Sequence, residues 1–433
     1  MKNIMLSFLL TLIVIPLPGQ KLLDIYKNGT VKLVPDTQYG QGNNWDNVFR
    51  TYYDTMYSKP MGGRKSLVVM PDGSVIVNHR YKNYYTKFSP AGKYEKEFGI
   101  ISSKGVQYKK INAIQGIIKN NTFYTGLDNM GNMICFDFSG NYIKSLKLNY
   151  MTRQMISLPN DKIAVVGWVL WSNKIREFVS IVDFETNAEK VIWEYFTERQ
   201  GLGEHSKLFN YSYKFKKGGA FSITTMPFSG TTGMSSAPEI AYIGNKLIVA
   251  IPPTGEILVY DLEGKLVSKD KIGWAKNYIT VAEQKDIQQK AIDKYKTMGT
   301  FDFSRWITPG TNTITAEENK LAHDEIVKQM EEDLNKISEP IPVPAFSTIV
   351  KDSDENLLFF EYPKEDNANK FNVWVYDNGG KFICQSSFVC DEYNLEINPS
   401  KMVFSNGYIY GLQLLKGATG VPLRLVRFKM TNN

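Results

Sequence analysis

One stretch decides the fold: Tyr260-Asp261-Leu262-Glu263-Gly264-Lys265-Leu266. It joins an aromatic residue and an aspartate to a glycine, a lysine and a further apolar residue. Glycine readily adopts the left-handed conformation of a tight hairpin turn, and alternating apolar residues flank the stretch on both sides. The pattern therefore predicts a turn between two antiparallel strands. Four further copies, the last with asparagine in place of glycine, are Phe88–Tyr94, Phe136–Tyr142, Tyr376–Phe382 and Val182–Asn187.

A second turn lies upstream of each copy. The first is Asp72-Gly73, between the apolar runs Leu67–Met70 and Val75–Val77. Two hairpins make a unit of four strands, and the first turns recur at residues 72, 120 and 160, a spacing that fits propeller blades. We predict an all-β fold, a six-bladed β-propeller forming a single domain over residues 21–433. Residues 199–235 leave a seventh blade as an alternative.

The last unit lacks its fourth strand, because the chain ends at Asn433 soon after the apolar run Leu423–Phe428. Near the N-terminus, Leu22–Tyr26 and Val31–Val34 have strand character but belong to no complete unit. We predict that an N-terminal strand completes the last blade and closes the ring, which leaves no open sheet edge between the first and last units.

A helical insertion interrupts the repeat at residues 275–345, between the fourth and fifth blades. Thr280 and Glu283 form a capping box before one amphipathic helix, and Thr315 and Glu318 begin a second. In a four-stranded meander the two tight turns share one end of the blade, and the remaining connections share the other. We therefore expect the insertion on the face opposite the tight turns, where variable loops commonly carry function.

The N-terminal segment has the features of an export signal. Lys2 precedes the apolar stretch Ile4–Leu17, which is too short to span a bilayer, and Gly19 follows near a plausible cleavage point. We predict a signal peptide at residues 1–20 and a periplasmic or secreted mature protein, with an uncleaved anchor as the alternative. No later stretch approaches the roughly 18 apolar residues of a spanning helix, so we expect no transmembrane segment after signal removal.

Charge and composition argue against several classes of function. The net charge of +7 is a mild excess, and it is not concentrated on one element as in nucleic-acid-binding proteins. The three histidines have no metal-ligand spacing, and we find no cofactor motif, so we expect no metal, no cofactor and no nucleic-acid partner. Buried free thiols are preferred for the cysteines, with a Cys384–Cys390 bridge as the alternative.

The chain resembles the six-bladed propellers of the NHL and TolB-like kind, a group common among exported bacterial proteins. The resemblance rests on the Tyr-Asp-x-x-Gly-Lys hairpins and covers roughly residues 60–275 and 346–430. It implies a role in binding or scaffolding, while some relatives are lactonases or dehydrogenases. No set of catalytic residues carries over, because no matching motif is present.

Candidate binding residues lie where aromatic and charged side chains fall on the expected insertion-bearing face. Aromatic surfaces flanked by cations suit sugars or nucleic acid, and the export signal favours sugars. We expect an exported, non-catalytic binding or scaffold propeller that recognises a glycan, peptide or protein there. The alternatives are a lactonase-like hydrolase or lyase with its site at the central channel, and a structural subunit of an envelope complex. The candidate residues are Arg80, Tyr81, Tyr84, Asp128, Trp168, Trp171, Arg305 and Trp306.

Overall fold

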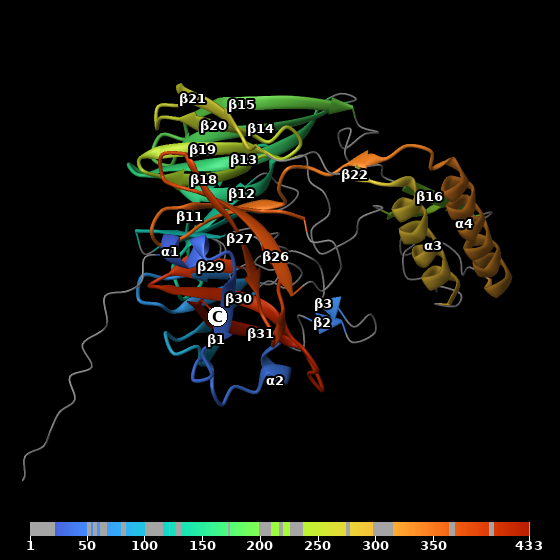
Figure 1. The fold of residues 1–433 in the computed structure, drawn as a ribbon, viewed down its shortest axis with the longest axis horizontal. Coiled ribbons are helices and arrows are strands. Elements are labelled where there is room, and N and C mark those ends of the chain that lie inside the picture. The colour runs from blue at the N-terminus through green and yellow to red at the C-terminus, as the bar shows by residue number, and fades with distance from the viewer. Residues whose placement is uncertain are drawn as a thin grey trace, which may run out of the picture.

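The computed structural model is mostly β, with small antiparallel sheets and two long helices (Figure 1). The predicted signal peptide at residues 1–20 lies outside the part of the chain that the structure describes. The described residues are 22–49, 53–54, 59–60, 67–78, 84–99, 116–120, 122–126, 132–171, 174–198, 209–215, 220–225, 237–273, 278–297, 315–362, 369–397 and 402–432.

Four sheets are four-stranded antiparallel meanders, in which each strand pairs with the next along the chain. Neighbouring sheets cover both faces of these sheets, so central strands such as β19 are apolar and buried at nearly every position. The strands are β4 (Leu67–Val69), β5 (Val75–Asn78), β6 (Tyr84–Phe88) and β7 (Tyr94–Gly99); β8 (Ile117–Lys119), β9 (Thr122–Gly126), β10 (Asn132–Phe136) and β11 (Tyr142–Lys147); β12 (Met151–Ser157), β13 (Lys162–Trp171), β14 (Lys174–Asp183) and β15 (Glu189–Glu198); and β18 (Glu239–Ile243), β19 (Lys246–Ile251), β20 (Glu256–Tyr260) and β21 (Leu266–Lys271).

The remaining repeat strands belong to one nine-stranded sheet, in which β1 (Val31–Pro35) joins two further groups. β1 pairs antiparallel with β31, where Leu33 lies opposite Met430, and parallel with β27. The predicted pairing of an N-terminal strand with the last strand of the chain is therefore confirmed. The other strands are β24 (Thr348–Lys351), β25 (Leu357–Phe360), β26 (Lys370–Tyr376) and β27 (Phe382–Val389), with β28 (Tyr393–Asn394), β29 (Met402–Ser405), β30 (Tyr408–Leu415) and β31 (Leu423–Thr431).

The segment Leu22–Tyr26, expected as a strand, is instead part of the helix α1 (Leu22–Lys27). Leu22, Ile25 and Tyr26 recur at the three- and four-residue spacing of one helical face. All three are buried in the core between β1 and the β24–β27 group, and the Tyr26 hydroxyl donates a 2.9 Å hydrogen bond to Asp352. The segment is helical because this spacing lets one helical face be buried, although its individual residues are also common in strands.

Hydrophobic clusters lie between successive groups of strands and give the molecule a propeller-like all-β fold. Tyr85 packs edge-on against Phe123 at 5.2 Å and joins the β4–β7 group to the β8–β11 group. Phe88 and Leu425 share a cluster that joins the β4–β7 group to the β29–β31 group. The innermost strands also contact one another in the order β8, β12, β18, β24, β29, β4.

The repeated turn has the geometry that its sequence predicts. Asp261 Oδ1 accepts hydrogen bonds from the backbone N–H groups of Glu263 and Lys265, at 3.0 and 2.8 Å. Gly264 has a φ of +73°, and a β-bulge lies just before Asp261. Asn187, which replaces glycine in the degenerate copy, also has a positive φ of +59°. Asparagine and glycine exchange here because both tolerate the left-handed region.

The predicted helices form a separate layer beside the sheets (Figure 1). α3 (Val281–Thr297) begins at the Thr280–Glu283 capping box, and α4 (Ala316–Lys336) begins at Thr315. The hairpin β16 (Phe209–Lys214) and β17 (Ala220–Thr225) packs on this layer through the buried Tyr211. These described parts of residues 199–235 therefore contribute to the helical layer and form no four-stranded meander.

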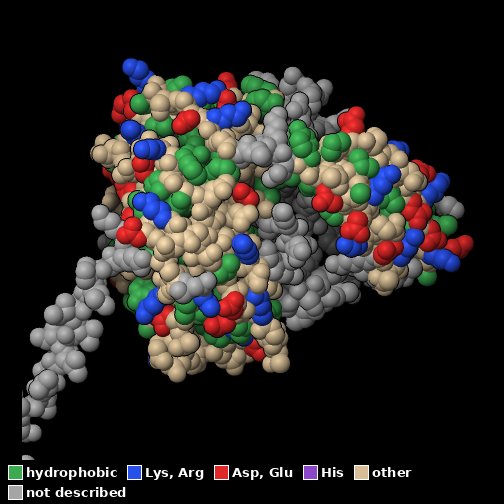
Figure 2. Space-filling view, in the orientation of Figure 1, with side chains coloured by type: hydrophobic (Ala, Val, Ile, Leu, Met, Phe, Trp, Pro, Cys, Tyr) green, Lys and Arg blue, Asp and Glu red, His purple; other side chains and the backbone are tan. Residues whose placement is uncertain are grey.

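The helical layer and α1 lie at opposite ends of the strands, α1 on the left and α3 with α4 on the right of Figure 1. Leu22 at the start of α1 donates to Asp354 in the tight turn between β24 and β25. Figure 2 shows acidic and basic side chains side by side over the helical layer. The other elements are α2 (Trp45–Phe49) and the two-residue pairs β2 (Tyr53–Asp54) with β3 (Lys59–Pro60) and β22 (Tyr278–Ile279) with β23 (Ile341–Pro342).

Candidate functional site

Of the eight residues predicted from the sequence as binding residues, Trp168 is the one whose side chain the structure describes. Tyr84 and Trp171 lie in the strands β6 and β13, but their side chains are outside the described part. Five further predicted residues lie outside the described part of the chain, so their predictions remain untested: Arg80, Tyr81, Asp128, Arg305 and Trp306.

Trp168 belongs to a polar cluster that the sequence did not reveal. Trp168 on β13 lies directly opposite Glu177 on β14. The Arg153 guanidinium on β12 lies 5.8 Å from the centre of the Trp168 ring, and its Nη2 is 2.9 Å from Glu177 Oε1. A register shift between Thr152 and Gln154 marks the position of Arg153 on its strand.

In the Arg153–Glu177 pair the carboxylate is buried, the guanidinium is partly exposed, and the hydrogen bonding is incomplete. The Glu177 side chain is 2% exposed and that of Arg153 is 25% exposed. Within the described part of the chain, both Glu177 carboxylate oxygens and Arg153 Nε lack a hydrogen bond of good geometry. Such groups are rare in folded proteins because each costs about 1–3 kcal/mol when unsatisfied. The ion pair therefore leaves polar atoms of both side chains able to form further hydrogen bonds.

A second carboxyl group, Glu239, lies close enough to feel the charge of Arg153. The pKa of Glu239 is raised to about 8, because burial penalises its charged form more than the Thr348 hydrogen bond and the Arg153 charge favour it. The Thr348 hydroxyl donates to Glu239 Oε2 at 3.2 Å. Part of Glu239 nevertheless remains exposed. Near neutral pH this group is an acid that can donate a hydrogen bond or a proton.

The acid–arginine cluster, which we define as Arg153, Trp168, Glu177 and Glu239, lies near the inner strands at the end that faces the helical layer. Arg153 and Glu239 are on the neighbouring inner strands β12 and β18. The side-chain amide of Gln154 holds these strands together through two hydrogen bonds to the Ile240 backbone, at 3.0 and 2.9 Å. Acids and an arginine converging near the inner strands are the arrangement that the central-channel alternative requires.

The sequence contained one signal that would have found this cluster. Glu177 alternates along β14 with Val179 and Ile181, which are buried in the core between the β12–β15 and β18–β21 groups. A carboxylate on such an apolar strand face is expensive unless it is paired or functional. Arg153 and Glu239 carry no comparable signal, because they become neighbours only when β12 and β18 meet.

The cluster offers hydrogen-bond donors from Arg153 and neutral Glu239, acceptors on Glu177, and the apolar Trp168 ring. This combination suits a ligand with many hydroxyl groups, because each hydroxyl both donates and accepts. Among the described residues no three His, Cys, Asp or Glu side chains come together as metal ligands. No helix in the described part is long and apolar enough to cross a membrane.

Comparisons with known proteins find distant likeness to solved structures and no match among sequences. Neither a protein-family model nor a curated protein matches the chain. A solved member of the DUF4221 family from Bacteroides vulgatus is 11% identical, with 94% of this chain and 100% of that chain covered and a TM-score of 0.45. Virginiamycin B lyase from Staphylococcus aureus is 11% identical, with 93% and 99% covered and a TM-score of 0.38. Likeness at this level carries no argument about function.

Proposed function

We propose that the curved arrangement of sheets is a six-bladed propeller of the NHL and TolB-like type. Four meanders and the two groups joined by β1 supply the blades, and β1 serves as the fourth strand of the last one. In this proposal residues 1–20 are a signal peptide and residues 21–433 one domain, with the insertion at 275–345. The mature protein is periplasmic or secreted.

We further propose that the protein is a binding protein whose acid–arginine cluster recognises a glycan. The observation that carries this proposal is the pairing of the buried Glu177 with the partly exposed Arg153, with polar atoms that the described residues leave without hydrogen bonds. Trp168 adds an aromatic face beside that pair. A glycan is favoured over a peptide or protein because sugar hydroxyls match paired donors and acceptors beside an aromatic ring.

A glycan array followed by titration calorimetry tests this function. We expect Arg153→Gln to weaken binding of the best oligosaccharide by about tenfold or more, since it removes a charged hydrogen-bond donor. Arg176→Gln is the matched control: Arg176 pairs with Glu194 and lies 4.9 Å from the Phe178 ring on the same sheet, but outside the cluster. Equal affinity in both variants, or no glycan bound at all, would contradict the proposal.

The second candidate is a hydrolase or lyase, favoured by the raised pKa of Glu239. A carboxyl group that stays protonated near neutrality can act as a general acid, and the Glu177 carboxyl group lies in the same cluster. Turnover of a panel of lactones and glycosides by the wild-type protein, lost in Glu239→Gln, would support this function. Absence of turnover in the wild-type protein would leave glycan binding as the better account.

A further inference from the structure

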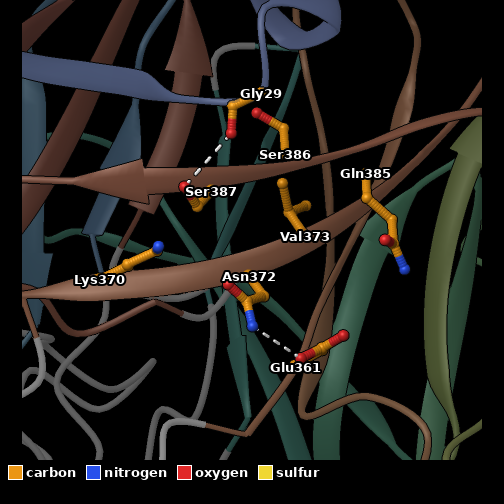
Figure 3. A pocket seen from close by; sticks show the side chains of 8 residues that line it. All are labelled: Gly29, Glu361, Lys370, Asn372, Val373, Gln385, Ser386 and Ser387. Atoms are coloured by element: carbon orange, nitrogen blue, oxygen red, sulfur yellow. Dashed lines mark hydrogen bonds between the residues drawn. The ribbon is translucent and has the colours of Figure 1, made fainter. Parts of the chain in front are cut away.

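A polar pocket that includes no residue of the acid–arginine cluster lies on the outer strands of the β24–β27 group. It has a volume of about 250 Å³ and is formed by β26, β27 and the Gly29 backbone (Figure 3). Val373 is the single apolar side chain among its lining residues. A pocket smaller than the usual drug-sized site, with such a lining, suits one small and strongly polar molecule.

Glu361 supplies a fixed negative charge on one side of the pocket. The indole Nε1–H of Trp374 donates to Glu361 Oε1 at 2.7 Å, and the Asn372 amide donates to Oε2 at 3.1 Å. Each oxygen therefore has a capacity to accept a further hydrogen bond. Since both partners are neutral, the full negative charge of Glu361 remains available to a cationic group.

Lys370 supplies a positive charge on another side. Figure 3 shows Lys370 and Glu361 on different sides of Asn372, and Lys370 is exposed. Among the described residues Lys370 forms no ion pair, either with Glu361 or with another carboxylate. Two opposite charges therefore face one small pocket without neutralising each other.

Ser386 adds a polar group that the protein leaves unsatisfied. The residue is 6% exposed, lines the pocket, and its Oγ has no hydrogen-bond partner in the described part of the chain. Its neighbour Ser387 is held by Gly29, whose carbonyl oxygen accepts a 3.1 Å hydrogen bond from the Ser387 N–H. Ser386 lies opposite Val373, so it is on the other face of the strand pair from Asn372 and Ser387, and Figure 3 shows its hydroxyl directed toward Gly29. The uncharged polar groups on the Glu361 side of the pocket are therefore those of Asn372, Gln385 and Ser387.

We propose that this pocket binds a small zwitterion of the α-amino-acid class, with the ammonium group at Glu361 and the carboxylate at Lys370. A neutral sugar fits less well, because no aromatic ring lines the pocket and a neutral ligand would form no ion pair with either charge. A ligand with one charge would compensate only one side. The zwitterion matches both, and the nearby amide and hydroxyl groups complete its hydrogen bonds.

Titration calorimetry with the twenty common L-amino acids tests the proposal. We expect at least one to bind, and Lys370→Gln and Glu361→Gln each to weaken it by about tenfold or more. The methyl ester and the N-acetyl derivative of the same amino acid should bind as weakly as in those variants. Lys381→Gln, at the tight turn of the same strand pair, is the matched control and should bind normally.

Other results would overturn the pocket assignment. They are binding of none of the twenty amino acids, equal binding in all three variants, or a neutral disaccharide that competes at this pocket. Arg153→Gln should leave amino-acid affinity unchanged, because it alters only the acid–arginine cluster. A failure of glycan recognition and a failure of this pocket are therefore distinguishable.

Discussion

Glu239 links the candidate site to a measurable dependence of stability on pH. Its pKa is raised to about 8 in the folded protein, whereas an unfolded glutamate titrates near 4.3. Between these values the unfolded chain has lost the proton that the folded chain keeps, so the free energy of unfolding falls as pH rises. Below the pKa of the unfolded glutamate, the contribution of Glu239 to the free energy of unfolding is fully present. Above about pH 8 this contribution is lost.

We expect Glu239→Gln to flatten this dependence, because glutamine stays neutral at every pH. Urea unfolding at intervals from pH 5 to 8 should show the wild-type protein losing up to about 1.4 kcal/mol per pH unit relative to the variant. Glu194→Gln, which alters an exposed glutamate on β15, should follow the wild-type curve. Parallel curves for the wild type and Glu239→Gln would show that Glu239 is not held neutral.

The individual residues of the site were the least predictable feature. Trp168 was predicted as a binding residue in the connection between two strands, but it lies within the strand β13. Arg153 and Glu239 come together only through the packing of β12 against β18. A single sequence contains no information on that neighbourhood when no repeat or motif marks it. Glu177 was the exception, because a charge interrupts an apolar alternation.

Among the structural elements, the tight turns followed from local chemistry and were predicted well. Two of them share a glycine with positive φ but differ in surroundings. A Cβ at Gly264 would lie 2.5 Å from the Ile192 side chain, whereas a Cβ at Gly380 meets nothing within 4 Å. Alanine substitutions at these two glycines therefore distinguish the cost of backbone strain alone, at Gly380, from the cost of strain together with a steric clash, at Gly264.

We expect Gly380→Ala to destabilise the protein by about 1–2 kcal/mol, the strain of a left-handed alanine. Gly264→Ala should cost at least about 1 kcal/mol more, because the branched Ile192 must also move. Chemical denaturation of both variants measures the difference. Equal losses would mean that the β12–β15 and β18–β21 groups are not in contact at this turn.

The helices show where element prediction succeeded and where it failed. α3 and α4 begin at the capping residues that the sequence marks, because caps are local signals. Helix α1 was mistaken for a strand, since six residues are too few to separate the two periods without the core on which Tyr26 packs. The hairpin β16–β17 was left open as part of a seventh blade, because the helix on which it packs, α4, lies about a hundred residues away in the chain.

For the whole molecule, the pairing of β1 with β31 joins the first and last described strands. Two neighbouring residues of β1 allow a matched test, because Leu33 is 1% exposed and Val34 is 38% exposed. We expect Leu33→Asp to lower the free energy of unfolding by about 3 kcal/mol or more, since it buries a charge in the core, and Val34→Asp to change it little. Similar losses in denaturant unfolding would contradict a closing role for β1.

Glycan recognition at the acid–arginine cluster is tested most directly by hydrogen–deuterium exchange with and without a saturating oligosaccharide chosen from the array. The binding proposal predicts slower exchange in β12, β13 and β14, the strands that present Arg153, Trp168 and Glu177. Unchanged exchange in these strands, with protection confined to the helical layer or to the outer pocket of β26 and β27, would contradict it.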